Sequence, residues 1–243
     1  MTLRAVMLLL AALAFAVAPA FSSFSGFDPG LYPVPQSDPP AQPAGYAFAI
    51  WGPIYLWLVA HAAFGLWRRR TAREWDAPRA PLSLSLAIGV PWLWVAGVSP
   101  LMATAMIWVM LAGALAAAAR TTTATDRAIL MPPVALYAGW LTAASCVSLA
   151  LVVAGWGIAG ELASGWAALA LALAIGAAVQ WRLERAPEYG AAIVWALVAI
   201  AVRAPGGLAL GAWAGAAIMA ILAGRALAME VAGRRAGAGG SPV

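Results

Sequence analysis

The stretch PAGYAFAIWGPIY, residues 43–55, places two prolines, two glycines and four aromatic residues at the start of a long apolar run. Pro43 suits the first turn of a helix, where its missing N–H would have had no partner, so we expect a helix to begin there. Pro53 would then lie well inside the helix, where it leaves the carbonyl of Ala49 without its donor. The sequence therefore predicts a helix that bends near Pro53.

Three aromatic residues of this stretch share one helical stripe. Phe48, Trp51 and Tyr55 are spaced i, i+3 and i+7, so their side chains project from the same face of a helix. This stripe is a candidate wall of an aromatic pocket.

The composition excludes a soluble protein. Of the 243 residues, 64% are hydrophobic and only 9% are charged, and the mean hydropathy is +0.88. Such a chain belongs in a membrane. Its net charge of +5 comes entirely from arginines in short loops, which the positive-inside rule explains without a nucleic-acid partner. The single cysteine, Cys146, excludes a disulfide within one chain.

Eight segments are apolar for about the 20 residues that a membrane crossing requires. We therefore expect an all-α, polytopic transmembrane helix bundle with about eight spans. The predicted spans are residues 4–22, 44–67, 80–98, 101–119, 129–155, 164–182, 188–203 and 205–227.

The arginines divide unequally between the two sides of this scheme. Thirteen of the 14 fall on one side, and only Arg203 falls on the other. An error of one span would scatter them, so the split supports the count and predicts that both termini are cytoplasmic. The Pro-rich loop 21–43 then lies on the opposite side, where it is long enough to cover the helix ends.

The sequence also leads to predictions for the two ends of the chain. Residues 4–20 read either as a retained helix or as a secretory signal with a small-residue cleavage site near Ala18 to Ala20. Pro19 within that motif argues against cleavage. At the other end, residues 231–243 are small, flexible and basic, and predict a disordered tail.

No group of residues indicates catalysis or a metal site. His61, the only histidine, is expected to be a neutral imidazole that donates to a carbonyl of a neighbouring helix. No pair of carboxylates lies within a span, and neither Ser145 nor Cys146 has a neighbour in sequence that would activate a nucleophile. We therefore expect no catalytic residues and no metal, and lean against an enzyme.

Gly207, Gly211 and Gly215 repeat every fourth residue along one face of the last span. Small residues at this spacing let two helix backbones approach closely. Packing within the bundle is the favoured interpretation, and a homodimer contact is the alternative.

With these residues laid out, the chain resembles the tryptophan-rich sensory protein family, also called the TspO/MBR or translocator protein family, in its longer bacterial form. The match lies in a P-x-G-Y-x-F-x-x-W-G-P-x-Y pattern from Pro43 to Tyr55 and in PVALYAGWLTAA from Pro133 to Ala144. The family's fifth-helix Asn has no counterpart, because that position reads Ser145.

The resemblance implies a five-helix ligand-binding domain over residues 1–156, three additional transmembrane helices over 157–230 and the tail 231–243. It implies an aromatic pocket under the first loop. At the same place, the free N–H groups and the positive dipole end of the helix start near Ala44 and Gly45 could receive a ligand carboxylate. The implied ligand-binding residues are Pro43, Gly45, Tyr46, Phe48, Trp51, Tyr55, Tyr137, Trp140, Ala144 and Ser145.

The expected function is an integral membrane sensor or carrier, placed by the resemblance in a bacterial inner membrane, that binds flat hydrophobic ligands. Porphyrins or other tetrapyrroles are the leading class; sterol-like molecules and membrane lipids are further partners. No cofactor is required, with a porphyrin or haem as a candidate bound group. A transporter of a lipid or small amphipathic metabolite is the alternative, and enzymatic porphyrin breakdown is a third view.

Overall fold

The computed structural model describes residues 1–22, 26–121 and 126–238, and within them every regular element is helical. The predicted all-α membrane bundle is confirmed. The helices are α1 (Thr2–Val17), α2 (Trp51–Trp67), α3 (Arg73–Asp76), α4 (Arg79–Gly89), α5 (Trp92–Ala96), α6 (Pro100–Ala118), α7 (Arg127–Leu130), α8 (Pro132–Gly155), α9 (Glu161–Arg182), α10 (Pro187–Arg203) and α11 (Gly206–Ala238).

All eight predicted spans are helical, and six of them form helices long and apolar enough to cross a membrane. The other two have local reasons to fall short. The third predicted span is divided into α4 and α5 at Val90 and Pro91, because proline has no N–H to continue the helix. The seventh, α10, has 17 residues and carries Glu188 and Arg203 at its two ends.

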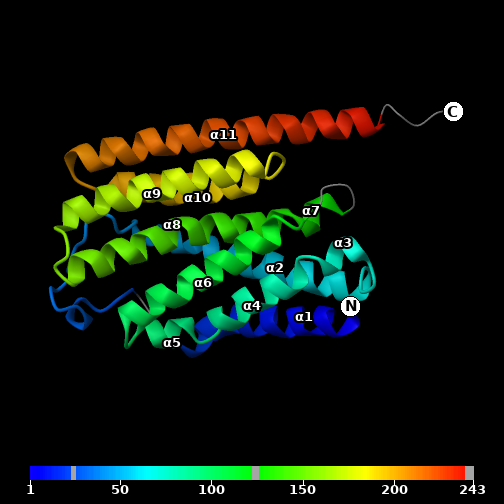
Figure 1. Cartoon of the computed structure of the whole chain (residues 1–243), viewed down its shortest axis with the longest axis horizontal. Coiled ribbons are helices and arrows are strands. Elements are labelled where there is room, and N and C mark those ends of the chain that lie inside the picture. Colours follow the sequence, from blue (N-terminus) through cyan, green and yellow to red (C-terminus); the bar gives the residue numbers. More distant parts are fainter. Residues whose placement is uncertain (23–25, 122–125, 239–243) are drawn as a thin grey trace.

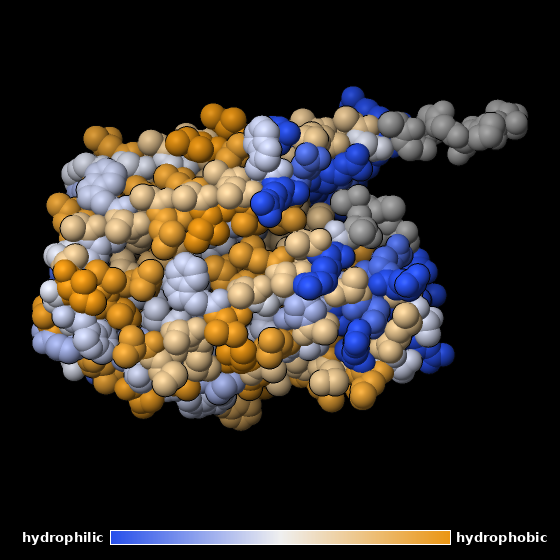
Figure 2. Space-filling view, viewed as in Figure 1, coloured by the Kyte–Doolittle hydropathy of each residue, from blue (hydrophilic) through white to orange (hydrophobic). Residues whose placement is uncertain are grey.

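Successive long helices run in opposite directions along the bundle, so both termini lie at the same end (Figure 1). Hydrophilic residues gather at that end, beside α3 and α7, whereas the middle of the visible surface is mostly apolar (Figure 2). We call this the charged end, and the opposite end, with residues 26–43, the loop end. The arrangement agrees with the arginine distribution, since Arg203 lies at the loop end.

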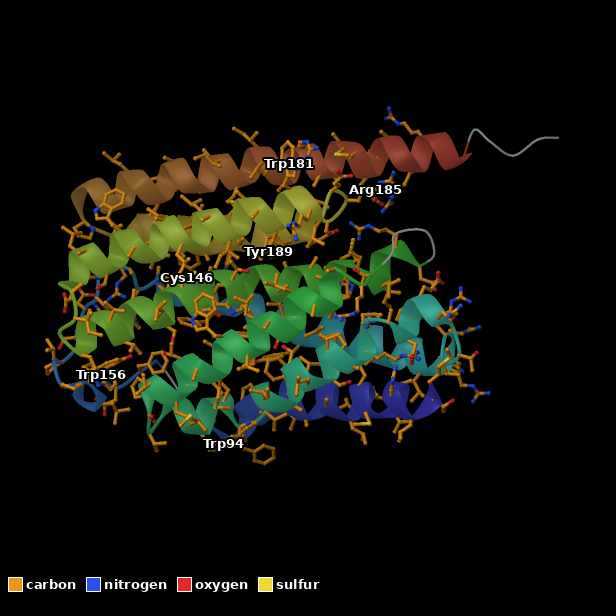
Figure 3. All side chains as sticks on the ribbon, in the orientation of Figure 1. Trp94, Cys146, Trp156, Trp181, Arg185 and Tyr189 are labelled. Carbon is orange, nitrogen blue, oxygen red and sulfur yellow. The ribbon has the colours of Figure 1, made fainter. Side chains whose placement is uncertain are left out.

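Helix α8 is the centre of the bundle. It packs against α6, α9 and α10, and most of its side chains are buried. At Gly139 the backbones of α8 and α10 approach so closely that a Cβ built there would lie 2.1 Å from the carbonyl oxygen of Tyr189. Figure 3 shows Tyr189 at this boundary. Helix α1 packs on the far side, against α2 and α4.

The stretch 43–55 folds differently from the prediction. Residues Gly45–Ile50 form a 3₁₀ helix, and the α-helix begins only at Trp51. Pro53 is therefore in the first turn of α2, where its missing N–H is tolerated, and not at a bend ten residues into a helix. The sequence pattern marked a helix start, but we assigned that start to the wrong proline.

The last helix also extends beyond its predicted limit. Helix α11 continues to Ala238, so residues 231–238 are helical, contrary to the disordered tail expected from residue 231; residues 239–243 lie outside the described residues. Glu230 and Arg234, one turn apart, form an ion pair at 2.9 Å. Such i, i+4 pairs stabilise a helix.

The glycine stripe of α11 is used inside the chain. Cβ atoms at Gly207 and Gly211 would meet the ring of Trp166, and one at Gly215 would meet Leu173. Both neighbours belong to α9. The stripe is therefore a packing face for α9, as the favoured interpretation held, and it is not free to form a dimer contact.

Candidate ligand-binding site

Aromatic side chains from three helices meet beneath the 3₁₀ turn that precedes α2. Trp51 and Tyr55 stack with ring centroids 5.2 Å apart and planes at 15°. Trp140 of α8 meets Trp51 edge-on at 6.0 Å. Phe15 of α1 packs edge-on against Tyr55 at 5.2 Å and against Tyr137 at 5.8 Å. Edge-to-face and offset-stacked pairs at these distances are the favourable arrangements for aromatic rings.

These rings border a cavity of about 340 Å³, which we call the large lobe. Its volume lies within the range of small-molecule pockets, about 300–1,000 Å³. Its walls come from α1, α2, the α4–α5 break, α6 and α8. The lining residues are Phe15, Ala18, Pro19, Ser22, Gly26, Phe48, Trp51, Tyr55, Gly89, Trp92, Leu93, Ile107, Met110, Trp140, Leu141 and Ala144.

A second cavity of about 90 Å³, the small lobe, lies next to the first and shares Phe48, Trp92 and Trp140 with it. Its remaining walls come from the loop, α8 and α10. The residues that line only the small lobe are Phe27, Tyr32, Gln36, Pro39, Gln42, Pro43, Ala143, Val147, Ser148, Leu151, Ala196 and Ile200. The helices beyond residue 156 therefore contribute to the wall through α10.

The structure brings six of the ten expected site residues to these cavities. Phe48, Trp51, Tyr55, Trp140 and Ala144 line the large lobe, so the predicted stripe of α2 does form a wall. Pro43, the sixth, lines the small lobe.

The other four expected residues lie elsewhere. Tyr46 faces α10, where its ring meets Trp195 edge-on at 5.5 Å. The hydroxyl groups of Tyr137 and Ser85 are 3.0 Å apart, so Tyr137 supports the cluster from behind. Ser145 donates to the Ile107 carbonyl of α6 at 3.4 Å. Gly45 begins the 3₁₀ turn and is not among the lining residues.

Sequence reasoning missed the contributions of α1, α4–α5 and α6. Phe15 is the single aromatic residue in the middle of the first span, and nothing in its spacing indicates which way it faces. Trp92 is fixed by its indole N–H, which donates to the Ala103 carbonyl at 2.8 Å. Its position beside Pro91, at the interruption of a span, is the one signal that could have identified it.

The expected anion site at the start of the second span loses one of its two donors. The N–H of Ala44 already donates to the carbonyl of Ala199 at 3.0 Å. Arg203, the one arginine at the loop end, forms an ion pair with Asp38. None of the described residues that line either lobe is Arg, Lys, His, Asp or Glu.

His61 behaves as the sequence predicted. It is fully buried, and its Nδ1–H donates to the Ile129 carbonyl of α7 at 2.9 Å. Its ring stacks on Trp75 at 5.0 Å. Among the described residues no group of three or more His, Cys, Asp or Glu side chains could hold a metal ion.

A search of protein-family models finds one described as "TSPO-like protein", which matches residues 33–225. The match starts after α1 and includes α9, α10 and most of α11, so it is not confined to the first five spans, where the sequence resemblance was found. Comparisons with curated proteins and with solved structures gave no match. The family match covers most of the chain and agrees with the apolar helices. The chain therefore belongs to the TSPO-like protein family, membrane proteins that sense or transport hydrophobic ligands.

Proposed function

We propose that the protein is a membrane sensor or carrier that binds a flat hydrophobic ligand in the large lobe, with tetrapyrroles as the leading class. The observation that carries this proposal is the cavity of about 340 Å³ beside the rings of Trp51, Tyr55 and Trp140. A flat ligand offers the same stacking and edge contacts that these rings make with one another.

The described lining residues favour binding over catalysis. They include no carboxylate, no histidine and no cysteine. Tyr32 and Tyr55 are therefore the only side chains of the described lining that could act in acid–base catalysis, and thiol chemistry has no group there. A free-base porphyrin is therefore the simplest probe. Haem would have to bind without an axial histidine or cysteine from these walls.

The proposed orientation places the charged end in the cytoplasm of a bacterial inner membrane. Thirteen arginines toward one end of the bundle fit the positive-inside rule. The cavities then open toward the non-cytoplasmic side, under residues 26–43.

The test is a porphyrin titration of the protein in lipid nanodiscs, followed by the absorbance of the porphyrin, with empty nanodiscs as the blank. We expect Trp51→Phe combined with Trp140→Phe to weaken binding about tenfold, because each lost aromatic contact contributes about 0.5–1.5 kcal/mol. Trp67→Phe with Trp213→Phe is the matched control, since both side chains are exposed. Equal affinities of the two double variants would show that the large lobe is not the site.

Transport of a lipid or small amphipathic metabolite is the second candidate function. The observation in its favour is that α10, through Ala196 and Ile200, forms part of the small lobe, so the last three helices reach the cavity. His61 is held by Ile129 and Trp75 and lines neither lobe, so we do not assign it a coupling role. Flux of a lipid analogue across reconstituted vesicles, reduced by Ala196→Trp, would support transport.

A further inference from the structure

Three side chains of the small lobe carry buried polar atoms that have no hydrogen-bond partner among the described residues. They are the hydroxyl of Tyr32, Oε1 of Gln36 and Nε1 of Trp140. The three residues are 4%, 4% and 3% exposed. Most buried polar groups in folded proteins are paired, and an unpaired one costs about 1–3 kcal/mol. Of the eight such atoms among the described residues, three belong to side chains that line this one cavity of about 90 Å³.

The Tyr32 side chain is held in place by close packing. The Tyr32 ring packs on α8 so closely that a Cβ at Gly155 would lie 2.2 Å from it, and Trp156 meets it edge-on at 5.8 Å. Figure 3 shows Trp156 at the loop end of the bundle. The backbone of Val34 is tied to Gly155 by a 2.8 Å hydrogen bond.

The chemical roles of the three atoms are defined. Gln36 uses its amide N–H to donate to the Val34 carbonyl at 3.1 Å, so its free Oε1 is an acceptor. The indole N–H of Trp140 is a donor only. Burial raises the pKa of the Tyr32 phenol well above its usual value, so the hydroxyl keeps its proton and can donate. The residues that line the lobe therefore hold two donors and one acceptor just beneath its surface, which a ligand reaches when the groups that cover them shift.

The uncharged lining of the two lobes determines which charge a bound ligand group can carry. No described residue that lines either lobe is charged, Arg203 is paired with Asp38, and the Ala44 N–H is occupied. An ionised carboxylate placed there would lose its hydration without gaining a cation, which costs far more than two neutral hydrogen bonds return.

We infer that the ligand has a neutral hydrogen-bonding group, a carbonyl or hydroxyl, at one end of its flat apolar body, and that this group binds in the small lobe. Its oxygen accepts from Nε1 of Trp140 and from the hydroxyl of Tyr32, and a hydroxyl ligand also donates to Oε1 of Gln36. The body lies in the large lobe against Trp51 and Tyr55. This inference rests on the proposed function and narrows its ligand class; a carboxylated tetrapyrrole would have to keep its carboxylates outside the cavity.

The test uses four probes with one flat skeleton: fluorene, 9-fluorenone, 9-fluorenol and fluorene-9-carboxylate. Binding is measured by calorimetry on the protein in nanodiscs, with empty nanodiscs subtracted. We expect fluorenone and fluorenol to bind about three- to tenfold more tightly than fluorene. This difference corresponds to the net free energy of one hydrogen bond. We expect the carboxylate to bind more weakly than fluorene.

Variants then assign the preference to the small lobe. Tyr32→Phe removes only the hydroxyl, and we expect it to reduce the preference for fluorenone over fluorene while the affinity for fluorene stays the same. Tyr46→Phe is the matched control, because Tyr46 packs on Trp195 outside both lobes. A preference unchanged by Tyr32→Phe, or tightest binding by the carboxylate, would overturn the inference.

The two proposals fail in different ways. Equal affinities for fluorene, fluorenone and fluorenol would refute the polar role of the small lobe and leave the aromatic cavity in place. Loss of binding by all four probes and by porphyrin would refute the proposed function itself.

Discussion

Both ends of the bundle contain buried polar atoms without a partner among the described residues, Nε2 of His61 and Oε1 of Gln180 at the charged end among them, but the two ends differ in buried charge. At the charged end, Arg79 is only 1% exposed, yet it donates to the carbonyls of Gly65, Arg69 and Arg70 at 2.8–2.9 Å and pairs with Asp76. At the loop end, three buried polar atoms around the small lobe lack partners among the described residues. The paired charges join helices, whereas the unpartnered atoms beside the small lobe are neutral groups that we propose as partners of a ligand.

The charged end joins the helices through two networks. In the first, Asp76 pairs with both Arg4 and Arg79, while Asp126 accepts from Arg69 and from the indole of Trp75. These bonds connect α1, α2, α3 and α4 to the residue just before α7.

In the second network, Arg127 pairs with Glu188 at 3.1 Å and with Glu230 at 3.2 Å. Glu230 is almost fully buried and was not considered in the sequence analysis. Through Arg127 the last two helices are joined to α7, and the described residues that line the cavities form no comparable charged network.

The largest loss of stability should come from removing the guanidinium group of Arg79 at the charged end. Arg79→Met leaves three carbonyls and Asp76 without their partner, and we expect a loss of about 3–5 kcal/mol of stability. The measurement is unfolding of the purified protein in detergent. Arg73→Met is the control, because Arg73 is exposed. If Arg79→Met unfolds at the same midpoint as wild type, the contacts of Arg79 at the charged end do not stabilise the fold.

A smaller effect is expected where α8 meets α10, between the two ends. Gly139→Ala places a methyl group within 2.1 Å of the Tyr189 carbonyl, so the helices must separate at a cost of about 1–3 kcal/mol. Gly224→Ala, in the open part of α11, is the matched control and should be neutral or slightly stabilising. If both variants behave alike, the close approach is not needed for packing.

The smallest effect should be the pH dependence of the charged end. The hydrogen bonds from Arg69 hold the pKa of Asp126 below its ordinary value, against the opposing effect of burial, and Trp75 lowers it further. A depressed folded-state pKa means that this stabilisation is present above about pH 4 and is lost as the pH falls through the folded-state pKa. Stability of wild type should therefore decline more than that of Asp126→Asn between pH 5 and pH 3. Parallel profiles would remove Asp126 from the acid response.

The sequence predicted the helices better than it predicted their contacts. Six of the eight predicted spans form helices long and apolar enough to cross a membrane, and the arrangement of the ends agrees with the arginines, because both depend only on local composition. The stripe Phe48, Trp51 and Tyr55 was found because its spacing is helical. Tyr46, in the 3₁₀ turn before α2, instead faces Trp195.

Contacts between distant segments were not predictable from local patterns. Trp75 lies between two predicted spans, yet it is 1% exposed between His61 and Gly65. Nothing in its neighbourhood in sequence indicates the Asp126 carboxylate, which is 51 residues away. The polar atoms of the small lobe, from the loop and from α8, are likewise adjacent only in the folded chain.

The 33 residues of α11 give it a length of about 50 Å, whereas the hydrocarbon core of a bilayer is about 30 Å thick. Its C-terminal part accordingly stands clear of α9 and α10 at the charged end (Figure 1). The ion pair between Arg127 and Glu230 holds α11 against α7. The part of α11 beyond Glu230 therefore projects from an anchored point. A spectroscopic label on it would amplify any rotation of α11 relative to α8 into a displacement readable from the aqueous phase.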